Sequence, residues 1–554
     1  MKLLPLLLAI LLLFTSCGID VSSLVPNTEP ETEVTSVVEK ETETLAIVSQ
    51  ARPNQTFGVG YVRDSILDPF QPVYQMNYDL VNLLYDRLFV IGPDGSPIYA
   101  LCDTITTEDS ITYTLTIHTD AFFHNGTRLT PQDVVYSLDR AQKSPLYSQS
   151  LSVISYAQYD NAANTITIKL THALGSLPAL LTFPVVSSAG GVDYEYHNYA
   201  LLGSGRYYID IEVLEETEYT YLQSYENWYG DAGQKSAVPR IDLFTVLDKD
   251  DLVHRYFNSD IDILSLSSAE NENPVLHGDA EKRILSGNHL TYIGFNTSLQ
   301  SFSTPESRLA IFHLVDKAEI AALLGGENAC LPVDYPIRSE SRSSTFLTEP
   351  LIADPEKVTS LLRKGGFADT RGNNDLEFHS SSFTLTLLAC SDSYDGVTVA
   401  NYLKEKLESV NFAVELKLYT YENYVDCLDK GEYNLYVGMT NPAPNYDYAY
   451  LIDYDDTFAA LQSRVNDRPS AGKTAGVSED VRSAIADIQA LKTYDPLYSL
   501  ELAEHIQSLF DEHMPFVPLC FDTTTVYLRG NFASGVECST QDIFYNIERW
   551  QNPK

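Results

Sequence analysis

The sequence predicts an α/β protein with at least two domains. Its 554 residues exceed the length that one hydrophobic core normally supports. In the C-terminal half, alternating apolar residues predict strands at Phe383–Ala389, Val414–Leu418 and Tyr433–Val437, with helical patterns between them. This βαβαβ order predicts parallel strands with a cleft at their carboxyl ends.

Two helices complete this βαβαβ unit. The second, Tyr421–Lys430, should end at Gly431, because glycine readily adopts the left-handed conformation that closes many helices. The first is marked by apolar residues that share one helical face, namely Val399, Leu403, Leu407 and Val410.

The stretch Ala121–Ala141 combines histidine, glycine, aspartate and arginine, yet its pattern predicts structure rather than catalysis. Asn125-Gly126 predicts a turn, because both residues tolerate a positive φ. Thr130 can cap a helix that opens with proline, and Asp133 stands where a capping-box acid reaches back. His124 and Asp133 therefore receive structural roles.

The first residues predict export. The apolar run Leu3–Phe14 is shorter than the ~20 residues that span a bilayer and fits a secretory signal. Cys17 follows small residues and resembles a lipobox cysteine, which would end a signal peptide at 1–17 and carry the lipids. The alternative is an ordinary signal peptide with an incidental cysteine. Residues 18–50 are rich in Thr and Glu, which predicts a disordered acidic tether.

The charge balance restricts the partners. Lys and Arg number 36 against 76 Asp and Glu, which gives a net charge of −40. Such a charge argues against nucleic acid and against electrostatic adhesion to anionic lipid. It does not by itself imply a cationic ligand, because a solvated acidic surface explains it.

Cysteines and loops predict no metal site. Seven cysteines include Cys17, and neither a CxxC pair nor a zinc-type spacing occurs. We expect mostly free thiols, with Cys520 and Cys538 as the first pair to test. Ala368–Leu376 lacks the acidic spacing of a calcium loop and predicts a hairpin connection.

Enzyme motifs are absent from the sequence. It contains no GxSxG, HExxH, GxxxxGK[ST] or GxGxxG. We therefore predict no catalytic residue and no cofactor.

Several segments together resemble one family. From Asp68 to Ala141 the chain contains LYDRLF and FHNGTRLTPQDVVYS, in an order similar to the signature region of the family 5 extracellular solute-binding proteins. The resemblance continues through later segments, namely Leu202–Ile209 (LGSGRYYI), Ser224–Gly230 (SYENWYG), Tyr292–Thr297 (YIGFNT), Ser307–Asp316 (SRLAIFHLVD), Asp354–Phe367 (DPEKVTSLLRKGGF) and Pro515–Leu519 (PFVPL).

The resemblance implies a periplasmic-binding-protein-like type II fold, with two hinged α/β lobes and an additional small α+β subdomain. The chain would cross between lobes near Tyr292–Asn296 and Pro518–Phe521. The implied divisions are lobe I (51–83, 201–291 and 520–554), the inserted subdomain or lobe II (84–200), and the distal lobe III (292–519).

The resemblance also implies a function. Members of the family are receptors of ABC importers, so this chain would be a monomer, lipid-anchored on the extracytoplasmic face of a bacterial membrane. It would capture oligopeptides or dipeptides and deliver them to a membrane permease. The alternatives are a surface sensor of peptide signals and a receptor for a metal chelate or another small solute.

The implied ligand contacts lie in Val437–Leu451. In peptide-binding relatives an aspartate here pairs with the peptide's amine, but this chain has Asn441 or Ala443 at that position. Either Asp447 replaces it or the ligand lacks a free amine, because an unpaired buried ammonium is costly; alternatively, the prolines here only shape a loop. The predicted ligand contacts are Asn441, Asn445, Tyr446, Asp447 and Tyr448.

Overall fold

The structure is a computed structural model whose chain divides into two units, Met1–Thr42 and Glu43–Lys554. The predicted signal peptide with Cys17 lies outside the described residues, as does the predicted tether except for Thr44–Ile47. The described residues are 44–47, 56–62, 68–71, 75–190, 192–193, 199–200, 202–214, 217–231, 236–268, 275–278, 280–452, 478–529 and 536–550.

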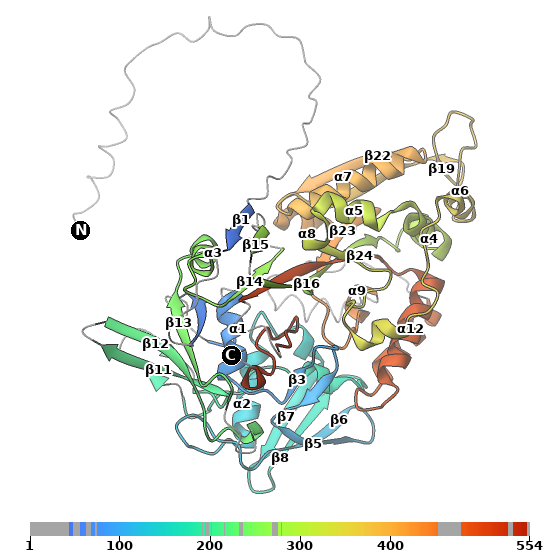
Figure 1. The fold of residues 1–554 in the computed structure, drawn as a ribbon. Helices are drawn as coiled ribbons and strands as arrows, with labels where there is room; N and C mark the ends of the chain where they lie inside the picture. The colour runs from blue at the N-terminus through green and yellow to red at the C-terminus, as the bar shows by residue number, and fades with distance from the viewer. Residues whose placement is uncertain are drawn as a thin grey trace, which may run out of the picture. The chain divides into compact units, whose positions relative to one another are not determined.

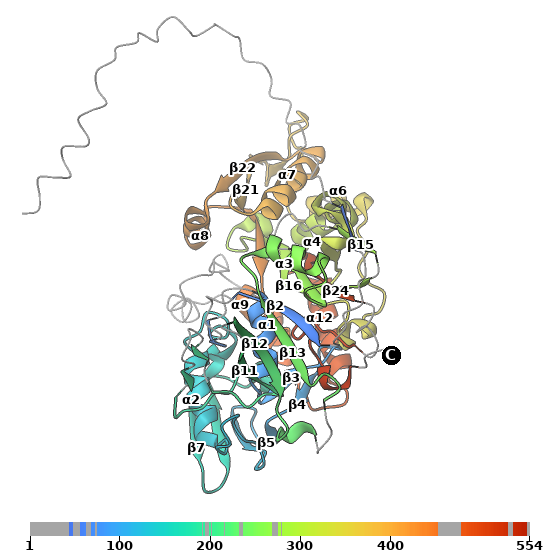
Figure 2. The ribbon, with the colours of Figure 1, turned by 60° about the vertical axis from the view of Figure 1, so that its left-hand side comes forward.

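Four strands of the first half of the chain form one sheet, in the order β11 (Tyr207–Leu214), β12 (Thr217–Ser224), β13 (Arg240–Thr245) and β2 (Phe57–Tyr61). The β13–β2 pair is parallel and the other pairs are antiparallel (Figure 2). Helix α1 (Gln75–Leu84) follows β2. The fully buried Asn77 side chain bonds both the N–H and the carbonyl of Val62, which fixes α1 to the end of β2.

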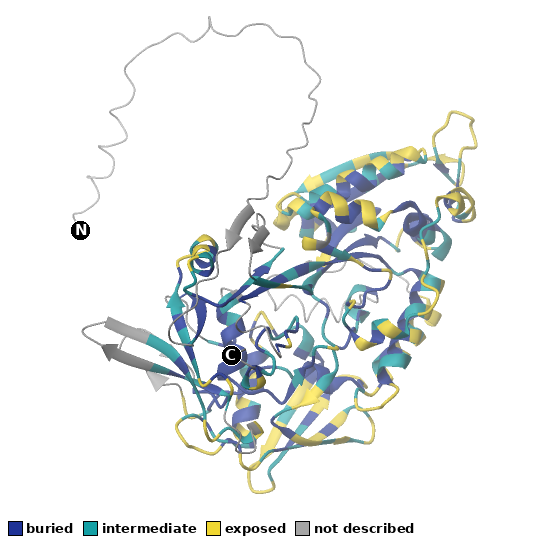
Figure 3. Cartoon of the chain, in the orientation of Figure 1, coloured by how far each residue is buried: buried dark blue, intermediate teal, exposed yellow. Residues whose placement is uncertain are grey.

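A second four-stranded sheet is antiparallel throughout, in the order β5 (Cys102–Thr107), β6 (Thr112–Ile117), β8 (Thr165–Leu170) and β7 (Ile154–Asp160). Helix α2 (Pro131–Ala141) packs against it, while much of the opposite face is exposed (Figure 3). The helix begins as predicted, because Asp133 Oδ2 accepts the N–H of Thr130 at 2.9 Å.

The histidine of the same region is structural in its contacts. A ring nitrogen of His124 lies 3.0 Å from the carbonyl oxygen of Gly205. Burial lowers the pKa of His124 to about 4, so the ring is neutral at physiological pH. Gly126 has a φ of +80°, in agreement with the predicted Asn125-Gly126 turn.

The largest sheet has seven strands, with β17 (Cys330–Pro332) on β24 and the others in the order β14 (Ile263–Ser267), β24 (Val517–Arg529), β16 (Ala280–Phe295), β23 (Leu435–Thr440), β21 (Thr384–Cys390) and β22 (Ala413–Tyr419) (Figure 1). The predicted βαβαβ unit is confirmed. Helices α7 (Tyr394–Ser409) and α8 (Tyr421–Lys430) connect its strands, and β21 is parallel to both β22 and β23. Gly431 closes α8 with a φ of +70°.

The remaining elements are shorter or cover these sheets. The other helices are α3 (Lys249–Phe257), α4 (Pro305–Leu314), α5 (Lys317–Leu324), α6 (Pro355–Lys364), α9 (Ala449–Ile452), α11 (Glu479–Ala490) and α12 (Tyr498–His513). The other strands are β1 (Thr44–Ile47), β3 (Phe89–Ile91), β4 (Pro97–Tyr99), β9 (Val192–Asp193), β10 (Tyr199–Ala200), β15 (Val275–Gly278), β18 (Phe367–Ala368), β19 (Glu377–Phe378) and β20 (Ser381–Ser382). Short 3₁₀ turns are η1 (Ser150–Val153), η2 (Leu177–Leu180), η3 (Tyr229–Asp231), η4 (Gln300–Phe302), η5 (Gly326–Asn328), η6 (Arg342–Phe346) and η7 (Ile547–Arg549).

Two of these short pairings bear on earlier predictions. Strand β1 pairs in parallel with β15, so the prediction of a disordered tether over 18–50 is wrong for Thr44–Ile47. Strands β18 and β19 pair antiparallel, so Ala368–Leu376 is the hairpin connection that the sequence predicts. Within the described part of the chain, no helix is both long and apolar enough to cross a bilayer.

Two large hydrophobic cores organise the described residues. One combines residues between Phe57 and Ile263 with C-terminal residues between Val526 and Trp550, and it includes both four-stranded sheets. The other lies between Leu290 and Phe521 and contains the βαβαβ unit. The two predicted divisions called lobe I and lobe II therefore share a core, and the domain boundaries themselves stay predictions.

Strands β16 and β24 connect the regions of these cores. Their register shifts between Ser286 and Leu290, where three residues of β16 oppose one residue of β24. Asp522 fills this bulge, because its Oδ1 accepts the N–H of His289 at 2.7 Å. A Cβ atom at Gly287 would lie 2.0 Å from that oxygen, so only glycine fits. The bulge interrupts the ladder where the chain passes between the cores.

The cysteines are free, as predicted, throughout the described part of the chain. Cys520 and Cys538, named as the first pair to test, are both free, and the Cys538 thiol donates to the carbonyl of Ile543 at 3.2 Å. Cys520 lies beside Cys330 instead: a hydrogen bond with Cys330 and burial raise the pKa of the Cys520 thiol.

Candidate functional site

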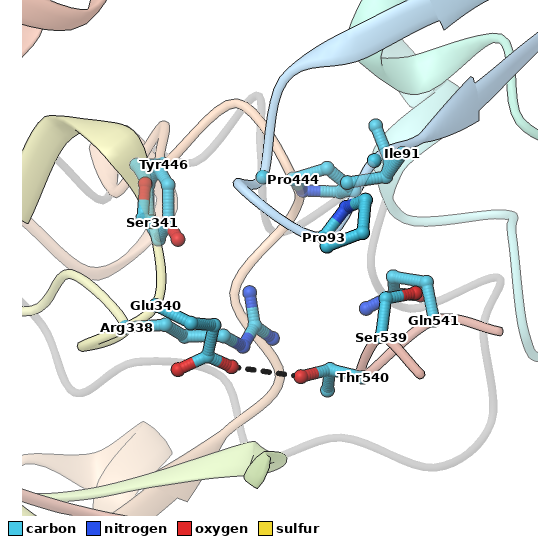
Figure 4. Close-up of a pocket in the computed structure, with 12 residues that line it drawn as sticks. Ile91, Pro93, Arg338, Glu340, Ser341, Pro444, Tyr446, Ser539, Thr540 and Gln541 are labelled. Atoms are coloured by element: carbon cyan, nitrogen blue, oxygen red, sulfur yellow. Dashed lines mark hydrogen bonds between the residues drawn. The ribbon is translucent and has the colours of Figure 1, made fainter. Parts of the chain in front are cut away.

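A small pocket lies where several distant segments meet (Figure 4). Its cavity volume is about 20 Å³, which accommodates little more than a water molecule. The lining residues come from the β3–β4 hairpin, from the segment after β17, from the loop after β23 and from the C-terminal segment. They are Ile91, Gly92, Pro93, Gly95, Arg338, Glu340, Ser341, Pro444, Tyr446, Ser539, Thr540 and Gln541.

Arg338 is the buried charge of this pocket, with 6% of its surface exposed. Its Nε donates to the carbonyl oxygen of Gly287 in the bulge at 3.1 Å, and its guanidinium carbon lies 5.2 Å from the centre of the Phe521 ring. Figure 4 shows the guanidinium directed toward the middle of the pocket. Among the described residues, no hydrogen bond or ion pair is found for its two terminal nitrogens.

Glu340 joins the pocket to two other segments. Its Oε2 accepts the Ser286 hydroxyl at 2.5 Å, and its Oε1 accepts the Thr540 hydroxyl at 2.8 Å (Figure 4). Ser286 belongs to β16 and Thr540 to the C-terminal segment. The carboxylate therefore connects the segment after β17 to both the crossing strand and the first core's C-terminal residues.

Backbone and amide contacts join the two regions around the pocket. The N–H of Arg342 donates to the carbonyl of Asp94 in the β3–β4 hairpin at 2.7 Å. On the other side, Asn445 Nδ2 donates to Ser176 Oγ at 3.1 Å, and the N–H of Gly175 donates to the carbonyl of Gln489 at 2.7 Å. The structure thus holds both regions in direct contact, and anything larger than water needs them to separate.

Two of the predicted contact residues have structural partners. Asp447 Oδ1 accepts the N–H of Ala449 at 2.9 Å and so caps α9, while Oδ2 accepts Gln489 Nε2 at 2.9 Å. The Tyr448 hydroxyl donates to the carbonyl of Pro336 at 2.5 Å, and burial raises its pKa well above the usual value. Both residues lie beside the pocket rather than lining it.

The other three predicted contacts differ in position. Tyr446 lines the pocket and has a left-handed φ of +53°, which orients its buried ring. Asn445 lies at the contact with Ser176. Asn441 Oδ1 is buried and has no hydrogen-bond partner among the described residues, so it remains available as an acceptor.

Sequence reasoning missed Arg338, Glu340 and Thr540. They lie outside the loop after β23, and their side chains meet only in the folded chain. No group of three His, Cys, Asp or Glu side chains in the described ranges could hold a metal ion.

The described chain has two α/β cores, two long strands that both cores share, and a pocket between segments of the two. These features define a type II periplasmic-binding-protein-like fold. Structural comparison agrees on the fold. The chain matches a nickel ABC transporter structure from Bacillus halodurans with a TM-score of 0.65 at 15% identity, covering 90% of this chain and 98% of that one. It matches AppA from Bacillus subtilis, in complex with a nonapeptide, with a TM-score of 0.54 at 16% identity, covering 93% and 100%.

The family follows from sequence comparison. Residues 97–460, more than half of the chain, match the family described as "Bacterial extracellular solute-binding proteins, family 5 Middle". The chain belongs to this family of solute-binding proteins, as the sequence motifs indicated.

Curated relatives are distant. The chain is 22% identical to the oligopeptide-binding protein AppA of Bacillus subtilis, over 92% of this chain and 94% of AppA. It is 20% identical to the glutathione-binding protein GsiB of Pectobacterium atrosepticum, over 63% of this chain and 66% of GsiB, just under two thirds of that protein.

Proposed function

We propose that this chain is the extracytoplasmic receptor of an ABC importer and that it captures short peptides without altering them. The pocket carries this proposal, because segments of both core regions meet there around a charged side chain. The two curated relatives named above bind oligopeptides and glutathione, both of them peptides, which supports peptide as the ligand class. The family consists of binding proteins, which favours capture over catalysis.

Capture follows from the arrangement of the two regions. A solute that contacts both of them binds the closed arrangement more tightly and shifts the population toward it. The bulge of β16 at Gly287 and Asp522 interrupts the ladder at the crossing, which makes it the expected place of bending. The closed receptor would then dock on a membrane permease.

The loop after β23 supplies the proposed ligand contacts. Tyr446 offers a pocket-lining ring, and Asn441 offers an unused acceptor for a ligand N–H. Asn445, Asp447 and Tyr448 complete the proposed set. Asp447 would have to exchange its bond with Gln489 for a bond with the ligand's amine.

The location is part of the proposal. Cys17 would carry the lipids after removal of 1–17, and the acidic segment after it would lift a monomeric receptor from the membrane. A Cys17→Ser variant should leave the membrane fraction, and retention there would refute the lipid anchor.

Native mass spectrometry of the purified protein tests the ligand class. We expect a heterogeneous set of short peptides that is released on denaturation. Recovery of a single metal complex or sugar would overturn the peptide proposal, and chemical conversion of an added peptide would overturn capture itself.

A further inference from the structure

The pocket contains a buried cation with unused donors. Arg338 is 6% exposed and uses Nε for the carbonyl of Gly287, while its terminal nitrogens face the cavity without a partner in the described ranges. A buried charge without a partner is strongly unfavourable. The Phe521 ring offsets only part of that cost, because a cation–π contact is weaker than the desolvation of a buried charge.

A second arginine shows how the fold satisfies a purely structural guanidinium. Arg308 is also 6% exposed. All three of its nitrogens donate to backbone carbonyl oxygens at 2.7–3.1 Å, those of Phe302, His513 and Met514. Arg338 is equally buried, but among the described residues no carbonyl accepts from its outer nitrogens. The difference points to a partner that is not among the described residues.

We propose that Arg338 binds a carboxylate of the ligand through its two terminal nitrogens. The planar guanidinium matches a carboxylate in a two-bond geometry, which is the strongest pairing available to it. This inference rests on the proposed function and deepens it: the ligand is an acid whose carboxylate enters the pocket first.

The surroundings restrict the charge of that ligand. The carboxylate of Glu340 lines the same pocket, and the chain carries a net charge of −40. Both disfavour a polyanion. A zwitterion, in which one carboxylate accompanies amide and amine donors, fits better, and a short peptide with a free C-terminus has this composition.

Arg338 also links the ligand to the crossing strands. Its Nε bond to Gly287 attaches it to the bulge that Asp522 fills. A ligand carboxylate bound by the outer nitrogens of Arg338 is therefore connected, through Nε, to the bulge at Gly287, which is the expected place of bending. This gives the ligand a direct means of favouring the closed arrangement.

The test compares trialanine with trialanine amide by calorimetric titration. The two probes differ only in the C-terminal charge. We expect the wild-type protein to prefer the free acid at least tenfold and Arg338→Met to bind both alike, with Arg338→Lys intermediate. Arg342→Met removes a neighbouring exposed arginine and should keep the wild-type preference.

Thermal unfolding of the ligand-free proteins separates binding from structure. Removal of an unpaired buried cation should leave the melting temperature of Arg338→Met unchanged or raised, whereas a structural arginine would lower it. An equal affinity of the wild-type protein for both probes would overturn the inference but would leave the peptide proposal standing. This comparison needs only the wild-type protein.

A further arm covers the case in which neither probe binds. That result refutes the peptide proposal, and the anion site is then judged with sodium succinate. A melting temperature raised by succinate in the wild-type protein but not in Arg338→Met supports the carboxylate site. No shift in either protein overturns it.

Discussion

Arg338 is buried and the Arg206 side chain is only 13% exposed, but the surroundings of the two arginines differ. Arg206 Nη1 lies 2.5 Å from Glu548 Oε2, and its Nη2 lies 3.4 Å from Asp542 Oδ2. Burial lowers the pKa of Arg206, but these two carboxylates outweigh it and raise that pKa overall. Arg338 has no carboxylate partner among the described residues.

The contrast shows how to distinguish a structural charge from a functional one. Around Arg206 the chain supplies both signs, so this cluster is complete without a ligand. Around Arg338 no described carboxylate forms an ion pair with the guanidinium, and we propose that a carboxylate of the solute does. The two regions are close in sequence at one point: Thr540 lines the pocket, and Asp542 belongs to the Arg206 cluster.

The largest expected effect comes from Arg206→Met. This change leaves Asp542 and Glu548 buried without their cation, so the free energy of unfolding should fall by about 3–5 kcal/mol. Urea unfolding at pH 7 measures the loss. If Arg206→Met unfolds like the wild-type protein, the distinction between the two arginines fails.

Lys430→Met is the matched control for that measurement. Lys430 pairs with Asp426 at 2.5 Å, but both side chains are more than half exposed. An exposed pair one helical turn apart contributes little to stability, because water and salt screen it. The control should therefore change stability by less than a fifth of the effect of Arg206→Met.

The next effect concerns Asp86, which lies in the same cluster. Burial raises its pKa to about 7, although the hydrogen bond from Trp228 and the charges of Arg206 and Arg87 oppose the shift. Since the folded state binds the proton more tightly than the unfolded state, Asp86 favours folding below about pH 4, and this contribution is lost as the pH rises to 7.

Asp86→Asn should therefore raise the free energy of unfolding above that of the wild-type protein by more at pH 8 than at pH 4. Asparagine keeps an oxygen acceptor for the Trp228 indole, which lies 3.1 Å from Asp86 Oδ1. The full shift corresponds to at most about 4 kcal/mol, and we expect roughly half of it after local relaxation. Urea unfolding at both pH values measures the difference. A stability difference that is independent of pH would contradict a protonated Asp86.

Much of the fold was predictable because its signals are local. The sequence predicted both ends of α8, since helix periodicity and the closing glycine act within a few residues. It could not predict the bulge, because His289 and Asp522 are 233 positions apart. Nor could it show that the first two predicted divisions share a core.

The site was predictable only in part. The loop after β23 was identified through its resemblance to the family, and Tyr446 does line the pocket. Arg338 was missed, because arginine is usually exposed and its local sequence does not reveal burial. What distinguishes it is the lack of a partner for its outer nitrogens among the described residues, which the folded chain shows and the local sequence does not.

Asp447→Asn is expected to weaken peptide affinity at least tenfold, about 1.4 kcal/mol, if the carboxylate binds the ligand's amine. Asparagine can still cap α9 through its oxygen, so the fold should persist. Calorimetric titration with trialanine measures the change. Asp487→Asn removes the same charge from an exposed position of α11 and should leave affinity unchanged. Wild-type affinity in Asp447→Asn would reduce Asp447 to a cap.

The smallest effect tests whether the two regions are independent. Thr540→Val removes the hydroxyl that donates to Glu340 and should cost about 0.5–1 kcal/mol of stability, while Thr540→Ser should retain it. The change does not touch Arg206 or Asp86, so its cost should add to that of Asp86→Asn within about 0.5 kcal/mol in urea unfolding. A larger coupling would mean that the charge cluster and the pocket respond together, and that the bond to Glu340 transmits the state of one to the other.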